Sequence, residues 1–476
     1  MIGIFLAGAF AISLGLFFNR NKLVNYALLF VFSALLVVFS IYEYNHINVI
    51  ELEFFKPDAI GVLLLFALTI VSIPVIIHGE RYIETHNIDE TPKSRAVFFG
   101  AMVALISACS IVLISGHIAV TWIFIEITTL SASALIYHHR NLRALEGVWK
   151  YVFICAISIT FVYIGILFLS LSLKDAGIED MSFDSLYANA AKLNPFWLKL
   201  AFLFIFTGFT AKIGLVPMYT AGIDAKDKAP APAGALLSSI LMNAGFVSIY
   251  RIYAVLSHTS LQHWANTVMI IAALLSIFVA TVYMTRIKNI KRMFAYSSIE
   301  HMGLVILGLS AGGIGVYAAI LHIFLHTLIK PTLFLQFNQV YWVYRSKSIY
   351  DVGNYFKYNK VGAILMLLAF ISATAMPPSG LFISEFLIFQ SLFEAHFIVI
   401  LLVVLLLLTM IIWGFGKNIF KLLFTPPLTI DETKIPRISG WESLSQYALL
   451  GLSVYLAYNP PVVFVTLIQD AVKLVQ

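Results

Sequence analysis

Residues 117–139 read HIAVTWIFIEITTLSASALIYHH, a helix-length apolar run with a single carboxylate, Glu126, near its centre. At about 1.5 Å of rise per residue, Glu126 lies roughly 13 to 18 Å from His117 and His138, the polar residues near the two ends. If the run crosses a bilayer, this carboxylate lies near the midplane, where inserting a charge costs about 3 kcal/mol or more. The run therefore predicts either a function or a charged partner for Glu126.

The composition indicates an integral membrane protein. The chain is 61% hydrophobic and 11% charged, with a mean hydropathy of +0.93, whereas soluble domains carry about 25% charged residues. Its two cysteines, Cys109 and Cys155, both lie in apolar segments, which excludes a disulfide scaffold and a C-x-x-C metal or redox site. The N-terminal MIGIFLAGAF has no basic stretch before its apolar residues, so we expect a retained helix there instead of a cleaved signal peptide.

The expected fold is all-α, with about 14 transmembrane helices in a single membrane domain over residues 1–476. The apolar segments of spanning length are 2–18, 23–43, 59–78, 96–115, 118–137, 149–172, 198–221, 232–256, 266–285, 293–311, 315–341, 361–389, 397–416 and 441–468.

Basic residues predict the orientation of these spans. Of the 30 lysines and arginines, 22 fall in odd-numbered loops, Lys226 among them, and six, including Arg251, fall in even-numbered loops or the C-terminal tail, while Lys212 and Lys330 lie within spans. The positive-inside rule then places the odd loops in the cytoplasm and both termini outside. The net charge of +6 follows from this topology and gives no reason to expect nucleic-acid binding. The expected location is a prokaryotic cell membrane.

Ionisable residues recur inside the spans. They alternate between acids and bases over successive helices, as a proton relay requires, because burial and neighbouring charges can shift the proton affinity of each group. A hydrogen-bonded packing role for a single histidine, or a structural ion pair for a single charge, is the alternative. The candidate proton-translocation residues are Glu126, Lys212, Glu300, His301, His322, His326, Lys330 and Glu385, with Asn243 as a polar addition.

One segment, LHIFLHTLIKP at 321–331, carries three of these residues. The i, i+4, i+8 spacing of His322, His326 and Lys330 puts all three on one helix face. Two histidines four residues apart could also bind zinc, but Lys330 would repel the ion and no H-E-x-x-H acid lies between them. We therefore expect a hydrated path and no metal.

Prolines interrupt two spans. Pro217 follows Lys212, and Pro377 and Pro378 precede Glu385; proline removes a backbone hydrogen bond and breaks a helix. Paired broken helices in corresponding positions are typical of transporters built from inverted repeats. We expect two five-helix repeats, 96–256 and 266–423, flanked by 1–95 and 424–476, with two unrelated kinks as the alternative.

Several of these motifs together resemble the antiporter-like subunits of respiratory complex I and of Mrp-type sodium/proton antiporters. The matching stretches are WIFIEITTLSASAL, FAYSSIEHMG, LHTLIKPTLFL and PPSGLFISEFLIF, and the resemblance covers about residues 60 to 425. Within that group they are most similar to the F component of hydrogenase-4, in the membrane arm of group 4 nickel–iron hydrogenases and formate hydrogenlyases.

The resemblance implies a role for each position. Glu126 matches the acid of the family's fifth helix and Lys212 the lysine of its seventh, a pair whose association and separation change the lysine's proton affinity. His301 and His326 match the polar axis between two half-channels. Glu385 matches the ionisable residue of the twelfth helix, on the exit side.

Of two further positions in the relay, one matches only some branches of the family and the other departs from the family pattern. Lys330 matches a lysine of the Mrp and hydrogenase branches. Many members carry a relay lysine on the eighth helix, where this chain has Asn243, which cannot titrate; His322 or Lys330 would have to replace it.

The resemblance implies a proton- or cation-translocating subunit of a membrane-bound redox complex. This chain carries no nickel, iron–sulfur or flavin motif, so catalytic and cofactor residues are expected in partner subunits: other membrane subunits and a peripheral redox arm on the cytoplasmic side with nickel–iron and iron–sulfur centres. The alternatives are an Mrp-type sodium/proton antiporter subunit, a complex I-like subunit, and a structural anchor for a peripheral enzyme.

Overall fold

The computed structural model describes residues 1–86, 91–427, 435–436 and 438–475. Throughout these residues the regular structure is helical, apart from isolated backbone bridges. The first helices are α1 (Ile2–Phe18), α2 (Lys22–Asn45), α3 (Ala59–Arg81), α4 (Pro92–Ile114), α5 (Ile118–Ile136), α6 (Leu142–Asp175), α7 (Phe183–Asn189), α8 (Pro195–Ile213), α9 (Thr220–Lys228), α10 (Ala231–Leu237) and α11 (Ile240–Ser257). The remaining helices are α12 (Gln262–Arg286), α13 (Ile290–Ala311), α14 (Ile314–Tyr344), α15 (Tyr355–Tyr358), α16 (Lys360–Ala373), α17 (Gly380–Glu394), α18 (Ile398–Phe424), α19 (Leu444–Tyr458) and α20 (Val462–Val472).

Local sequence signals explain where many of these helices begin. The side chains of Asn21, Thr91 and Asn141 each accept a hydrogen bond from a backbone N–H in the first turn of α2, α4 and α6, as N-cap residues do. Proline occupies the first position of α4 and α8, where its missing N–H costs nothing.

Eleven helices in the described residues are long and apolar enough to cross a membrane, or twelve if α19 and α20, which meet at 70°, count as one bent span. The chain is therefore a multi-pass membrane protein. Two further expected spans fall short of this length: α1 has 17 residues, and the segment 361–389 divides into the shorter helices α16 and α17. This accounts for the difference from the 14 spans expected.

Both proline interruptions lie between helices. Pro217 lies between the end of α8 at Ile213 and the start of α9, and Pro377 and Pro378 lie between the end of α16 at Ala373 and the start of α17. The span expected at 198–221 is thus two helices, and its second part extends to Lys228. The boundaries of the two five-helix repeats stay a prediction.

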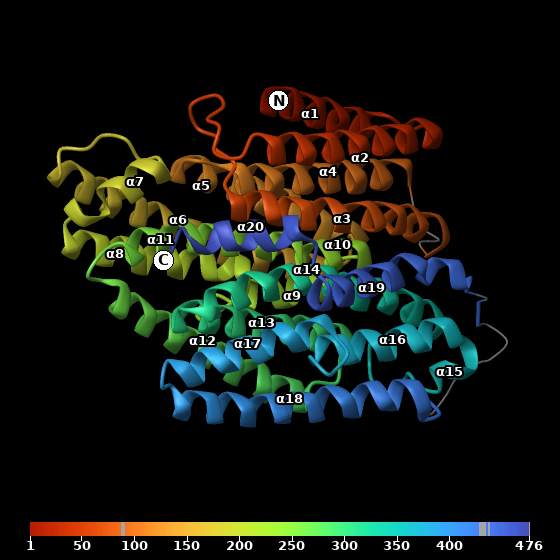
Figure 1. Cartoon of the computed structure of the whole chain (residues 1–476). Coiled ribbons are helices and arrows are strands. Elements are labelled where there is room, and N and C mark those ends of the chain that lie inside the picture. The colour runs from red at the N-terminus through yellow and green to blue at the C-terminus, as the bar shows by residue number, and fades with distance from the viewer. Residues whose placement is uncertain (87–90, 428–434, 437, 476) are drawn as a thin grey trace.

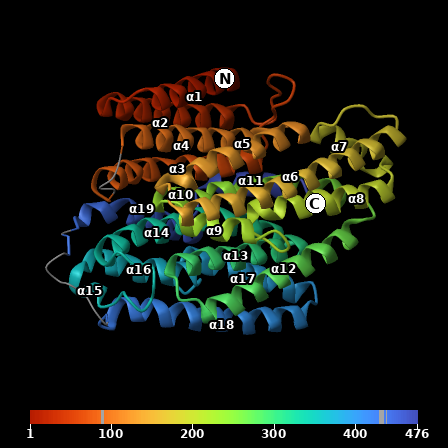
Figure 2. The same ribbon diagram turned by 180° about the vertical axis from the view of Figure 1, so that it is seen from behind.

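The helices run roughly alongside one another, with α1 and α2 at one edge and α18 at the other (Figures 1 and 2). Both termini lie at the end of the bundle that carries α7, and α15 lies at the opposite end. In the segments 231–257, 290–311 and 314–344, every residue of an 18-residue apolar stretch is buried, whereas only 33% of such a stretch is buried in α2 and in α18. The interior therefore holds α10, α11, α13 and α14, which can carry polar groups away from lipid.

Candidate functional site

A row of polar side chains runs through the buried helices of the interior. Most of its members have almost no exposed surface, between 0% and 8%. An unpaired polar group buried in this way is costly, so the contacts of each member decide what the row can do. The buried members are Lys212, Asn243, Glu300, His301, His322, His326, Lys330 and Glu385.

One end of the row joins α5 to α8 through a threonine. The Lys212 ammonium donates to Thr129 Oγ1 at 2.7 Å and to Thr128 Oγ1 at 3.3 Å, and Thr129 Oγ1 lies 3.2 Å from Glu126 Oε2. Glu126 itself is only half-buried. The expected pairing of Glu126 with Lys212 is therefore indirect, because the Thr129 hydroxyl lies between the two charged groups.

The middle of the row joins α11 to α14. Thr327 Oγ1 donates to Asn243 Oδ1 at 2.8 Å. Asn243 Nδ2 and both ring nitrogens of His326 are buried and have no hydrogen-bond partner among the described residues. Since buried polar atoms in native proteins nearly always find a partner, the row is interrupted here: these three atoms lack a hydrogen-bond partner from the described part of the chain.

The far end of the row is a tight cluster on α13, α14 and α17. His301 Nδ1 lies 3.2 Å from His322 Nε2, 3.6 Å from Glu300 Oε1 and 3.7 Å from Glu385 Oε1. His301 Nε2 is 3.0 Å from the carbonyl oxygen of Ala373, the last residue of α16. A proton can thus be shared between the two rings, and the His301 ring also lies near two carboxylates, while His322 Nδ1 lies 3.0 Å from Ser384 Oγ.

The two histidines and the lysine of α14 all face α13, as their spacing predicts. The His322 and His326 rings lie 5.2 and 5.4 Å from the His301 ring, centroid to centroid. The Lys330 ammonium donates to the Ser297 hydroxyl. Lys330 and Lys212 share one property: neither has a carboxylate oxygen within 4 Å in the described ranges. Their ammonium groups donate to hydroxyl groups instead, and that of Lys212 also lies 5.6 Å from the centre of the Tyr151 ring.

A further buried lysine joins this region. Lys226, on α9, is 3% exposed, and its ammonium lies 3.3 Å from Met242 Sδ, next to Asn243. Its expected place among the cytoplasmic loop residues is wrong. The nearby sequence APAPAG at 229–234 could have indicated that Lys226 is buried. Small side chains allow close packing of helices, and this run is buried throughout.

A cavity of about 250 Å³ opens beside the second helix break. Its lining includes the carboxylate residues Glu300 and Glu385, together with Thr374 and Pro377 from the break itself. Irregular backbone within a membrane is tolerated where it lines a cavity. The cavity gives the far end of the row a route toward the surface of the chain.

The cluster at the far end has the composition of a possible metal site. One ligand atom each of His301, His322 and Glu385 lies within 4.8 Å of the others. This set differs from the His322–His326 pair that the sequence suggests. A hydrogen bond between the two facing histidine nitrogens fits a shared proton equally well, and the expectation of no metal stays a prediction.

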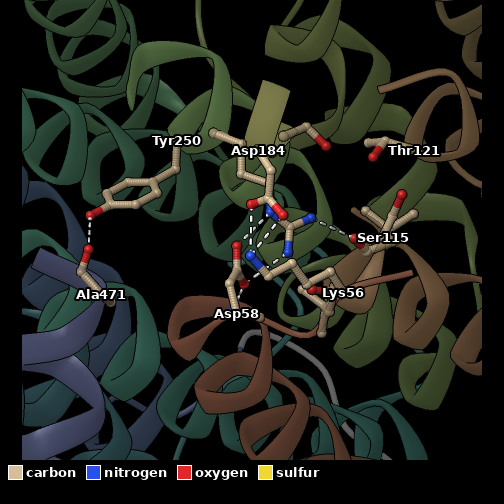
Figure 3. A network of polar contacts seen from close by, with 12 residues as sticks. Lys56, Asp58, Ser115, Thr121, Asp184, Tyr250 and Ala471 are labelled. Carbon is tan, nitrogen blue, oxygen red and sulfur yellow. Dashed lines mark hydrogen bonds and ion pairs between the residues drawn. The ribbon is translucent and has the colours of Figure 1, made fainter. Parts of the chain in front are cut away.

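A second buried charge cluster lies outside the row, between α3, α4 and α11. Arg251 Nε and Nη2 donate to the two carboxylate oxygens of Asp58, each at 2.9 Å, and its nitrogens also donate to the carbonyls of Val112 and Leu113 at 3.0 and 2.6 Å. Figure 3 shows Asp58 in this network, with the Lys56–Asp184 pair nearby. Arg251 is fully buried on α11, so its expected place in a loop is wrong.

Comparison with known proteins connects this geometry to a family. The family model described as "NADH:quinone oxidoreductase/Mrp antiporter, TM" matches residues 115–411, which include every residue of the row. The chain belongs to this family.

Individual members agree with the assignment. The chain is 28% identical over 348 residues to a hydrogenase-4 component F homolog of Methylacidiphilum infernorum (isolate V4), covering 72% of this chain and 73% of that protein. It is 27% identical over 408 residues to NADH-quinone oxidoreductase subunit N of Ruthia magnifica subsp. Calyptogena magnifica, covering 83% and 82%. A chain in the structure of the membrane-bound sulfane sulfur reductase, an archaeal respiratory membrane complex, has the same fold, with a TM-score of 0.86 at 20% identity over 100% and 96% of the two chains.

The chain is thus an antiporter-like membrane subunit of the NADH:quinone oxidoreductase/Mrp family, as the sequence motifs predict. The relatives above are components or subunits of larger membrane complexes, which agrees with the expectation of membrane partners.

Proposed function

We propose that this chain translocates protons across the cell membrane as a subunit of a multi-subunit redox complex, of the membrane-bound nickel–iron hydrogenase or formate hydrogenlyase type. The observation that carries the proposal is the buried row itself, in which lysines without carboxylate partners alternate with histidines that contact each other. A structural ion pair needs its counter-charge within hydrogen-bond reach. A group that must gain and lose a proton should have no such fixed counter-charge, because a fixed counter-charge favours one protonation state.

The proposed path uses each contact in turn. A proton taken up near Glu126 reaches Lys212 through the hydroxyl of Thr129, which can accept from the ammonium and donate to the carboxylate. Water beside Asn243 and His326 carries it past the position that cannot titrate, to Lys330, which lies one turn after His326 on α14. The His326, His301 and His322 rings then deliver it to Glu385 and the cavity at the second helix break.

Redox chemistry would belong to the partners. We propose that other membrane subunits lie against this chain, and that a peripheral arm on the cytoplasmic side holds the nickel–iron and iron–sulfur centres. Purification of this chain through a tag in mild detergent tests this part. A nickel-containing arm among the co-purifying polypeptides supports the proposal, whereas only small membrane subunits without metal would support sodium/proton exchange of the Mrp type.

Proton translocation is tested on the purified complex in vesicles that contain a pH-sensitive dye. Glu126→Gln and Lys212→Met should each abolish proton movement while the complex still assembles, and the double variant should be scarcely worse than either, because the two residues act as a unit. Lys199→Met is the matched control, since Lys199 lies on the same helix over the ring of Trp264, away from the row. Full proton movement in either single variant would contradict the relay.

The proposed orientation places both termini outside and the loop 286–292, with its four basic residues, in the cytoplasm. A single cysteine introduced in this loop should be labelled by a membrane-impermeant thiol reagent only after the cells are broken. Labelling in intact cells would reverse the orientation.

A further inference from the structure

A second cavity, of about 430 Å³, lies at the end of the bundle that carries α15. It is formed where the start of α6, the end of α9, the start of α13 and the segment after α14 meet. The cavity takes no part in the buried row.

Positive charge dominates the lining of this cavity. Five cationic side chains face one acid, Asp227, whose oxygens are already occupied: Lys228 binds Oδ2 at 2.9 Å, and Asn289 binds Oδ1 at 3.0 Å. The five cations are Arg143, Lys228, Lys291, Arg345 and Lys347.

The cations are arranged from a buried floor to an exposed rim. Lys291, 3% exposed, forms the floor and donates to the carbonyl of Ala229. Arg143 and Arg345 are exposed at the rim. The Arg345 guanidinium stacks 3.9 Å above the Trp342 ring, and Arg143 has no ion pair or hydrogen bond among the described residues.

The crowding of like charges affects their protonation. Burial lowers the pKa of Lys347 against the opposing pull of Asp227, and the positive charges of Lys228 and Arg143 lower it further. A site that gathers cations at this cost, without protein anions to match them, is complementary to an external anion.

We propose that this cavity binds a phosphate group, and that its source is the headgroup of an anionic phospholipid. Guanidinium forks and ammonium groups around one concave site match the oxygens of a phosphate. The cavity lies at the helix ends, and aromatic residues Phe337 and Tyr341 form part of its wall, as is typical of the interfacial level of a membrane. Basic pockets between helices on the cytoplasmic side are suited to such headgroups.

The test uses the purified complex, stripped of lipid in detergent, and short-chain phosphatidylglycerol below its micellar concentration. Inorganic phosphate and short-chain phosphatidylcholine are compared as ligands, and binding is followed by thermophoresis. The double variant Arg143→Gln/Arg345→Gln changes only exposed rim residues, so the fold should be retained. Removing two charges should weaken phosphatidylglycerol binding by about thirtyfold.

Arg140→Gln is the matched control, because Arg140 is exposed just before α6, three residues from Arg143, and is not among the residues that line the cavity. It should bind phosphatidylglycerol like the parent protein. Binding of inorganic phosphate as tight as that of the lipid, with both lost in the double variant, would retain the phosphate site and reassign its source to free phosphate. Unchanged lipid binding in the double variant, or no binding by the parent complex, would overturn the proposal.

Discussion

The Arg251–Asp58 cluster and the row from Lys212 to Glu385 are both buried and charged, but they are built in opposite ways. Arg251 has a carboxylate and two backbone carbonyls within 3.0 Å. Lys212 and Lys330 donate to hydroxyl groups and have no carboxylate oxygen within 4 Å among the residues that the structure describes. The first arrangement stabilises one charge state, whereas the second has no fixed counter-charge, which is what the proposed relay requires.

The surroundings of Arg251 add to its structural character. Val112 and Leu113 belong to the last turn of α4, where backbone carbonyls carry partial negative charge. Asp58 also caps α3 by accepting from Gly61 N at 2.8 Å. A Cβ on Gly61 would lie 2.0 Å from the Leu113 carbonyl oxygen and 2.9 Å from Arg251 Nη2, so only glycine allows this close approach. The cluster fastens three helices together.

The largest effect on stability is expected for Arg251→Met. Removing one partner of a buried ion pair leaves the other charge uncompensated, at a cost of about 3–5 kcal/mol. The variant should show a clearly lower melting temperature in detergent and a low yield of assembled complex. Tyr250→Phe, which removes one hydrogen bond to the Ala471 carbonyl (Figure 3), is the control and should change the melting temperature little. If Arg251→Met melts at the same temperature as the parent, the Arg251–Asp58 cluster does not stabilise the fold and does not differ from the buried row in this respect.

A smaller effect, on proton movement and not on stability, is expected at Asn243. Asn243→Lys adds a cation near Lys226 and Lys212, and like-charge repulsion lowers the proton affinity of the neighbouring groups. Proton movement should weaken, with its pH optimum shifted downward. Asn243→Leu removes the hydrogen-bond acceptor of Thr327 and any water held there, so it should slow the flux. If both variants match the parent in vesicles, the route does not pass position 243.

Much of the fold and the site can be predicted from sequence, because charged residues are costly inside a membrane and are therefore rare within the spans. Apolar runs mark the spans, and an ionisable residue such as Lys330 stands out within one. The shared face of His322, His326 and Lys330 follows from helical spacing alone. Contacts between distant segments do not follow from any local pattern. Neither the Thr129 bridge nor the approach of His301 to Ala373 could be predicted.

The misplaced residues have one physical cause. Lys226 and Arg251 lie near the ends of apolar segments, where a charged side chain normally reaches water or the lipid interface. Sequence alone cannot distinguish such a residue from one whose helix end is enclosed by other helices. In this protein α9 and the second half of α11 are enclosed, and both side chains are buried.

The central claim is that the unpaired buried cations serve proton movement and not folding. The most direct test measures melting temperature and proton flux on the same preparation of Lys330→Met, with Arg251→Met and Lys199→Met in parallel. Lys330 has no carboxylate partner in the described part of the chain, and replacing it with an apolar residue of similar length removes the cost of a buried charge. We expect a melting temperature equal to or above that of the parent, with proton flux at background. A lower melting temperature together with undiminished flux per assembled complex would contradict the account.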